Sequence, residues 1–245
     1  MMKTAKVVAV LFLSMLPLGA ISMSLVACNN DDSEESPEVV DRSPAQAIDL
    51  GLPSGTLWAS CNVGATKPEE YGDYFAWGET TGFKNGKTNF SWDTYKWCNG
   101  GDKKITKYCN DSNYGNDGFA DGKTELDLVD DAAYANWGNN WRMPNYNQVY
   151  ELIDNCNWEW TTLNGVRGCK VTSKKNGNSI FLPAAGGYFR TEFKDASVYG
   201  DYWARSLYTN KPSSARGLHI GPEGGFGLQG VRYYGNCIRP VYVKK

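Results

Sequence analysis

The chain contains one histidine, His219, and any Ser-His-Asp or Cys-His nucleophile system would have to use it. His219 lies in a glycine-rich run near the C-terminus, and the sequence offers it no obvious carboxylate partner. We therefore expect His219 to contact solvent or a ligand. We predict no catalytic residues and no enzymatic activity.

The seven cysteines are the next candidates for chemistry. No C-x-x-C pair occurs, and one histidine is too few for most zinc sites. Among the cysteines after Cys28, Cys98 and Cys109 bracket a polar turn, which makes them the best candidates for a local disulfide in an exported protein. The alternative is that all of these later cysteines are buried or unpaired thiols.

An acidic run that begins at Asp111 opens like a calcium-binding EF-hand loop. Its glycine, Gly115, comes one place early, and Gly122 stands at the twelfth position, where such a loop needs a glutamate. The sequence also lacks the E-P-N motif by which calcium lectins bind sugars. We therefore predict no metal site and no cofactor.

Aromatic residues make up 13% of the chain, with nine tryptophans and fifteen tyrosines. The common use of such residues is packing in the core and between sheets, and we favour it here. The alternative is a set of platforms on which sugar rings stack. Trp158 and Trp160 would share one face of a strand, so one of the two could be exposed for that purpose.

The composition describes a folded protein with little net charge. A chain of 245 residues with 41% hydrophobic content is long enough for one good core. The formal net charge of −2 gives no general attraction to nucleic acids or to anionic membrane surfaces. We therefore expect no nucleic-acid partner, and contact with a membrane through a lipid anchor only.

The N-terminus has the pattern of a lipoprotein signal peptide over residues 1–27. Two lysines precede a long apolar run that ends in L-V-A-C at 25–28, a lipobox whose Cys28 thiol would take diacylglycerol. A transmembrane anchor is the alternative, and a proline and a glycine within the run argue against it. Residues 28–46 are rich in Asp and Glu, which predicts a solvated, acidic and flexible tether.

The remaining chain predicts two helices and many short strands. Asp130 and Asp131 favour the start of a first helix, and Asn145 with Gln148 forms a capping-box pattern at the start of a second. Asn-Gly pairs, such as 164–165, indicate tight turns between antiparallel strands. The order of elements indicates an α+β domain over residues 47–245, with strands expected at 47–50, 57–63, 74–77, 158–163, 166–173, 179–182, 202–207, 215–220 and 236–243.

Several runs carry a resemblance to a known family. W-R-M-P-N at 141–145 resembles the helix-opening signature of C-type-lectin-like domains of the sulfatase-modifying-factor type. The span 48–241 resembles the Fibrobacter succinogenes major paralogous domain, which is common in Bacteroidetes lipoproteins. The matching runs are I-D-L-G-L-P-S-G-T-L-W-A (48–59), G-D-Y-F-A-W-G-E (72–79), D-D-A-A-Y-A-N-W-G (130–138), K-K-N-G-N-S-I-F-L-P-A-A-G (174–186) and R-P-V (239–241). The resemblance implies a C-type-lectin-like fold with two short helices, antiparallel sheets, long loops and paired terminal strands.

The block 204–231 departs from that resemblance. Relatives of the family usually fill it with Ser, Asn and Tyr, whereas this chain has mixed residues between family-like flanks. Such a change resembles the variable region of proteins diversified by a retroelement, and ordinary drift in an exposed loop is the alternative. Binding residues concentrate on such segments, so we predict ligand contacts at Ala204, Arg205, Arg216, His219, Ile220, Glu223, Phe226, Gln229 and Val231.

Together these features predict an outer-membrane lipoprotein, exposed on the cell surface, that binds a protein or glycan through the 204–231 face. The acidic residues directly after Cys28 resemble the surface-export signal of Bacteroidetes lipoproteins. The alternative is that this segment only acts as a spacer between the anchor and the domain. The competing functions are a glycan-handling accessory, a structural envelope lipoprotein and an oxidase of the sulfatase-modifying type. This sequence has no stretch that matches the catalytic residues of such an oxidase.

Overall fold

The computed structural model describes residues 40–244. The predicted signal peptide, Cys28 and residues 28–39 of the tether lie outside the described residues. The tether was expected to run to residue 46, but its last residues contact the domain. The backbone N–H of Arg42 donates to the Trp137 carbonyl at 2.8 Å, and the Trp141 indole donates to the Asp41 carboxylate at 3.2 Å. The ordered domain therefore begins several residues before Ala47.

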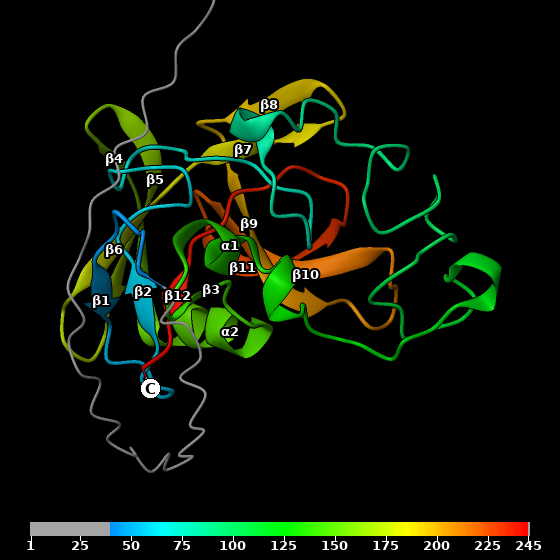
Figure 1. Ribbon diagram of the computed structural model, residues 1–245. Helices are drawn as coiled ribbons and strands as arrows, with labels where there is room; N and C mark the ends of the chain where they lie inside the picture. Colours follow the sequence, from blue (N-terminus) through cyan, green and yellow to red (C-terminus); the bar gives the residue numbers. More distant parts are fainter. Residues whose placement is uncertain (1–39, 245) are drawn as a thin grey trace, which may run out of the picture. The chain divides into compact units, whose positions relative to one another are not determined.

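The α+β class is confirmed, and the two ends of the domain meet in one sheet (Figure 1). This four-stranded sheet has the order β1 (Ala47–Asp49), β2 (Leu57–Ala59), β12 (Val241–Tyr242) and β3 (Trp141–Arg142). Trp58 on β2 is opposite Val241 on β12. The predicted strand 57–63 is shorter than expected, and only residues 241–242 of the predicted strand 236–243 belong to this sheet.

Both predicted helices form, as α1 (Ala132–Trp137) and α2 (Tyr146–Asn155). The Asp131 side chain caps α1 by accepting from the Tyr134 N–H. Asn145 and Gln148 form the expected reciprocal capping box at the start of α2. None of the helices within residues 40–244 is long and apolar enough to span a bilayer.

The predicted meander also forms, with β4 (Cys156–Leu163), β5 (Val166–Ser173) and β6 (Ser179–Pro183) in sequential antiparallel order. Asn164 and Gly165 both have positive φ, at 49° and 86°, in the two-residue turn between β4 and β5. This turn geometry matches the right-handed twist of the strands and explains why an Asn-Gly pair is found there.

A five-stranded sheet was only partly expected. Its order is β11 (Gly224–Val231), β10 (Ser214–Gly221), β9 (Gly200–Leu207), β7 (Ala185–Phe189) and β8 (Glu192–Ala196). β9 and β10 match the predicted strands, whereas β7, β8 and β11 were not predicted. Strand β11 has four glycines among its eight residues. Glycine is disfavoured in strands, so its composition argues against a strand here.

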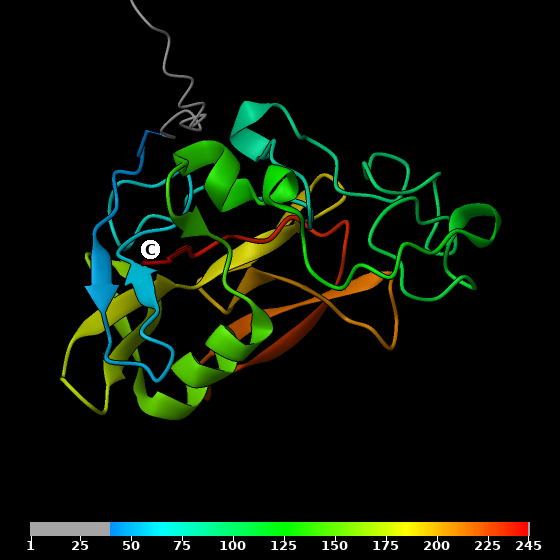
Figure 2. The same cartoon turned by 60° about the horizontal axis from the view of Figure 1, so that its bottom comes forward.

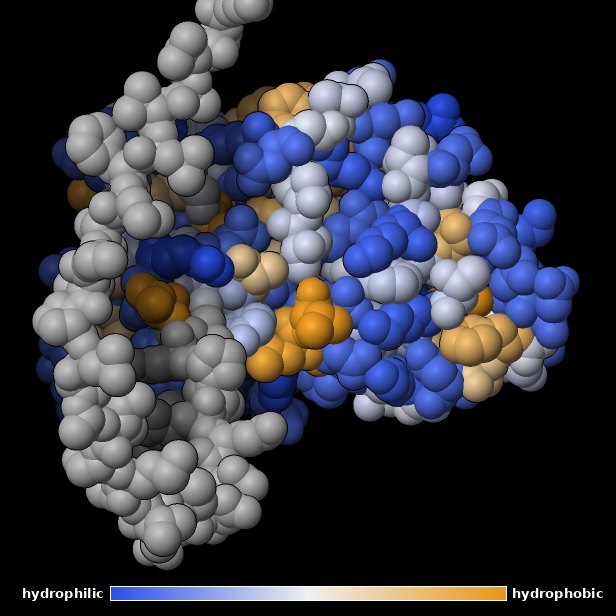
Figure 3. Space-filling model, in the orientation of Figure 1, coloured by the Kyte–Doolittle hydropathy of each residue, from blue (hydrophilic) through white to orange (hydrophobic). Residues whose placement is uncertain are grey.

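Residues 60–127 form long loops with two short 3-10 helices, Phe83–Asn85 and Asn116–Gly118. A third, Leu128–Asp130, leads into α1. The predicted strand 74–77 forms only an isolated bridge at Phe75. In Figures 1 and 2 much of this region extends to one side of the sheets, and in Figure 3 its visible surface is mostly hydrophilic.

Two buried arginines hold the loops to the sheets. The Arg232 guanidinium is fully buried and donates to the Tyr95 hydroxyl and to the carbonyls of Lys107, Tyr108 and Pro212, at 2.8 to 3.1 Å. It also lies 4.7 Å from the Trp77 ring. Arg239 is likewise buried and donates to the Asn62 side chain and to the carbonyls of Ala59, Ser60 and Phe181. Neither arginine has a carboxylate partner within the described residues.

Candidate functional site

The block 204–231 does not form a single face. It forms β10 and β11 and half of β9, and alternate side chains on these strands point to opposite sides of the sheet. One side, called here the inner face, packs against α2 and the β4–β6 meander. The other side, called here the outer face, carries His219 and Phe226. The predicted ligand residues are therefore divided between two surfaces and the core.

Ala204 and Ile220 are fully buried, with no exposed surface, so their prediction as ligand residues was wrong. Both pack on the inner face with Val149 and Leu152 of α2 in the larger hydrophobic cluster. Their apolar character reflects packing in the core, because a side chain without solvent contact cannot bind an external ligand.

Arg216 lies on the inner face near the start of α2. Its guanidinium lies between two rings, 4.4 Å from the Tyr146 centroid and 4.4 Å from the Tyr208 centroid. It also donates to the Tyr146 hydroxyl at 3.2 Å. Arg216 forms one wall of a small polar cavity of about 280 Å³, which also has Glu125 and Ser206 in its lining. Gln229 on β11 is directly opposite Arg216 and is exposed.

Arg205 forms an ion pair with the loop region and lies outside the row of His219 and Phe226 on the outer face. Its Nε lies 3.0 Å from Glu125 Oε2, and the side chain is about one-third exposed. Backbone hydrogen bonds fix both ends of this contact, because the Leu126 N–H donates to the Arg205 carbonyl and the Arg205 N–H donates to the Pro144 carbonyl. Arg205 therefore links the loops to β9.

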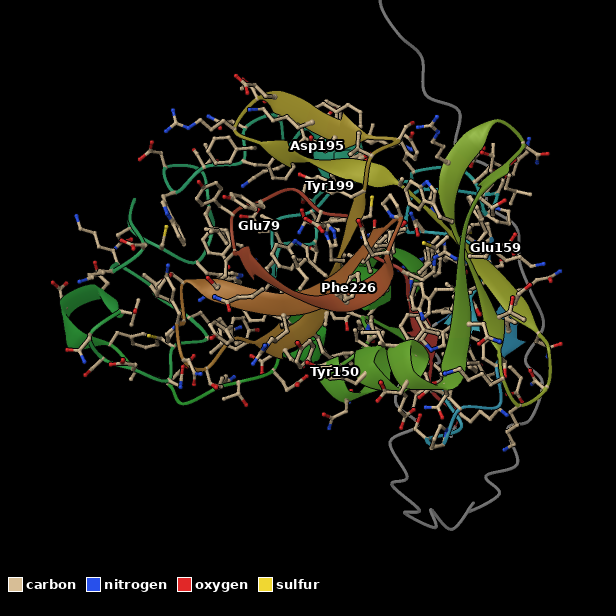
Figure 4. The ribbon with its side chains drawn as sticks, turned by 180° about the vertical axis from the view of Figure 1, so that it is seen from behind. Glu79, Tyr150, Glu159, Asp195, Tyr199 and Phe226 are labelled. Atoms are coloured by element: carbon tan, nitrogen blue, oxygen red, sulfur yellow. The ribbon has the colours of Figure 1, made fainter. Side chains whose placement is uncertain are left out.

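The outer face has a row of three side chains across three neighbouring strands. Phe226 on β11 is directly opposite His219 on β10, and His219 is directly opposite Asp201 on β9. Phe226 is 49% exposed, and the His219 and Asp201 side chains are 35% and 20% exposed. Tyr199 completes this surface, with its ring 5.2 Å from the His219 ring. Figure 4 shows Phe226 on β11, with Tyr199 above it and Tyr150 of α2 below it.

His219 does have a carboxylate partner, contrary to expectation. Its Nδ1 lies 2.6 Å from Asp201 Oδ1, and this hydrogen bond raises the pKa of His219 above its ordinary value, although partial burial opposes the shift. Asp201 was missed because it lies 18 residues before His219 and meets it only through the strand register. No described hydroxyl or thiol hydrogen-bonds to His219.

Of the two remaining predicted contacts, Glu223 lies at the margin of the outer face, whereas the strand register places Val231 on the inner face. Glu223 is exposed in the β10–β11 turn and contributes to the raised pKa of His219 through its negative charge. Val231 at the end of β11 is half-buried. Asp195 accepts from the Tyr199 hydroxyl at 2.5 Å, which adds a third acid next to Asp201 and Glu223. The outer face is therefore an aromatic surface with an acidic margin.

The predicted disulfide between Cys98 and Cys109 is not formed, and both are free thiols. Cys98 Sγ donates to the Trp92 carbonyl, and Cys109 Sγ donates to the Asp111 carbonyl, each at 3.1 Å. The two thiols therefore point into different loops, although a polar turn separates them in sequence. The remaining cysteines after Cys28 are also free and are buried: Cys61, Cys156, Cys169 and Cys237.

Within residues 40–244, no cluster of three or more His, Cys, Asp or Glu side chains could hold a metal ion. Trp158 and Trp160, considered above as sugar platforms, are half-buried and pack against the larger core cluster. In comparisons with known proteins, no family model, no curated protein and no solved structure matches this chain.

Proposed function

We propose that this protein is a non-catalytic binding protein of the cell surface, which recognises a protein ligand through the outer face of β9–β11. The observation that carries the proposal is the exposed Phe226 beside the His219–Asp201 pair. An exposed aromatic side chain on a rigid sheet loses little conformational freedom on binding, and such residues often dominate interface energy.

The chemistry of the outer face favours a particular kind of partner. Asp195, Asp201 and Glu223 surround the aromatic side chains of Tyr199 and Phe226. A complementary partner presents an apolar pocket for Phe226, flanked by lysine or arginine side chains. Because exposed charges contribute to such an association, its affinity decreases as the salt concentration rises.

The experiment compares two phenylalanines at opposite edges of the same sheet. Phe226 on β11 is 49% exposed and Phe193 on β8 is 44% exposed, so Phe193→Ser is a matched control. Proteins captured from a cell-envelope extract by the wild-type chain and by Phe193→Ser, but not by Phe226→Ser, support the proposal. Equal capture of every partner by Phe226→Ser, with its fold intact by circular dichroism, overturns it.

The same proposal includes lipid anchoring at Cys28 and exposure on the outer membrane, supported by the L-V-A-C run and the acids that follow it. Cys28→Ala is expected to release the protein from the membrane fraction. Mass spectrometry of the native protein is expected to find acyl groups on Cys28. A mature chain with a different N-terminus and no lipid contradicts this part of the proposal.

We also propose that the domain has a C-type-lectin-like fold. Its support is the pairing of β2 with β12 at the two ends of the domain, together with the long loops over residues 60–127. The proposal predicts that an experimental structure of the chain superposes on C-type-lectin-like domains with these strands in equivalent positions. A superposition that requires a different strand order would contradict it.

A further inference from the structure

A second candidate site lies between the loops and the β7–β8 turn. It is a cavity of about 450 Å³, a size within the usual range for small-ligand sites. Three separate parts of the chain form its wall: the loop 89–100, the turn at 190–191 and Tyr233 after β11. The lining residues are Asn89, Ser91, Trp92, Asp93, Gly100, Arg190, Thr191 and Tyr233.

Backbone hydrogen bonds fix this cavity. The Phe90 N–H donates to the Arg190 carbonyl at 2.9 Å, and the Arg190 N–H donates to the Phe90 carbonyl at 2.8 Å. Arg190 has a φ of 57°, an unusual value for a residue with a side chain. The double hydrogen bond holds Arg190 in this left-handed conformation beside the cavity, so the site is formed before any ligand arrives.

Two aromatic residues supply an apolar wall. The Trp92 and Tyr233 rings meet edge to face, with centroids 5.0 Å apart and planes at 76°. Both side chains are only half-buried, so part of each ring is open to the cavity or to solvent. The electron-rich face of such a ring attracts the C–H bonds on the flat side of a sugar ring.

The polar residues around the cavity include groups that have no hydrogen-bond or ion-pair partner within the described residues. Asn89 Oδ1 is buried and accepts no hydrogen bond, which is costly for a polar atom without a partner. Asp93 and Arg190 are exposed and take part in no ion pair within the described residues. Asp93 and Arg190 are therefore free to bind a ligand with several hydroxyl groups, which can donate to Asp93 and accept from Arg190.

Charge balance narrows the class of ligand further. Asp93 repels an anionic ligand and Arg190 repels a cationic one, whereas a neutral ligand meets both a donor and an acceptor. We propose that this cavity binds a neutral saccharide unit, packed against the Trp92 and Tyr233 rings and hydrogen-bonded by Asp93 and Arg190. The site is separate from the outer face, because none of its lining residues belongs to β9, β10 or β11.

The test uses the purified full chain and a panel of neutral hexose oligomers, with a polyuronate as the acidic comparison. Binding is measured by isothermal titration calorimetry and by tryptophan fluorescence. We expect at least one neutral oligomer to bind. Asp93→Ala and Trp92→Ala should each weaken that binding about tenfold or more. Asn85→Ala, which changes an exposed asparagine outside the cavity, should leave it unchanged.

Three outcomes overturn the proposal. The first is no binding of any neutral oligomer at concentrations up to about 10 mM, which is weaker than a functional site requires. The second is binding of the polyuronate alone. The third is saccharide binding that both cavity variants retain. Trp92→Phe and circular dichroism separate a loss of binding from a loss of folding, because the smaller ring keeps an aromatic wall.

Discussion

Gly225 on β11 lies directly against the indole of Trp158 on β4. A Cβ atom at Gly225 would stand 2.5 Å from a ring carbon of Trp158, closer than any real side-chain contact. Gly227 and Gly230 are restricted in the same way, by the Tyr146 hydroxyl and by the Trp203 ring. The glycines of this block therefore allow the sheet to approach its neighbours closely.

Gly225→Ala is expected to destabilise the fold by about 1–3 kcal/mol, because the added methyl group must displace a packed indole. Urea unfolding measures the change. Gly101→Ala is the control, since a Cβ there meets nothing closer than 3.8 Å and the φ of Gly101 is not in the left-handed region. Equal stability of the two variants would show that Trp158 does not pack on β11.

The His219–Asp201 pair predicts a pH-dependent contribution to stability. Because the pKa of His219 is raised in the folded state, the pair stabilises the fold fully below the unfolded value of about 6.5. This stabilisation disappears as the pH rises through the higher folded pKa. Since the chain has one histidine, its NMR titration is unambiguous. In Asp201→Asn the pKa should fall, and an unchanged titration would refute the pairing.

Arg232→Met is expected to destabilise the protein by roughly 3 kcal/mol or more, because it leaves several buried carbonyl oxygens without donors. The loss should also expose residues 60–127 to limited proteolysis. Arg167→Met is the matched control, since Arg167 is exposed on β5. If both variants unfold at the same urea concentration, Arg232 does not hold the loops in place.

Cys98 and Cys109 are expected to remain separate thiols. Non-reducing peptide mapping of protein prepared without reductant should recover each in its own peptide, and neither in a linked pair. Alkylation of the folded protein should modify Cys98 before Cys109, because Cys98 is partly exposed and Cys109 is buried. Recovery of one disulfide-linked peptide would instead restore the prediction made from the sequence.

Local signals in the sequence predicted the parts of the fold that local signals control. The capping box at Asn145 and the Asn-Gly turn at 164–165 act within a few residues, so their positions were correct. Strand β11 forms because its glycines fit against Trp158, Tyr146 and Trp203, and no pattern within β11 contains that information. Packing against distant segments therefore determines that β11 forms a strand.

The candidate sites were harder to predict for the same reason. Phe226 and His219 were correctly expected to be accessible, but their contact with Asp201 depends on a register that links three strands. Ala204 and Ile220 belong to the same block and are buried, because alternation along a strand sends its side chains to opposite sides. The cavity at Asn89 brings together three segments that no sequence spacing connects.

The attachment of the loops through Arg232 has a consequence for how the protein responds to acidity. A guanidinium stays charged throughout the biological pH range, and three of its four hydrogen-bond partners are backbone carbonyls, which do not titrate. The fourth is the Tyr95 hydroxyl, whose pKa is raised by burial. Acidification therefore changes the charge of the outer face at His219, while the hydrogen bonds of Arg232 that attach the loops keep their donors and acceptors.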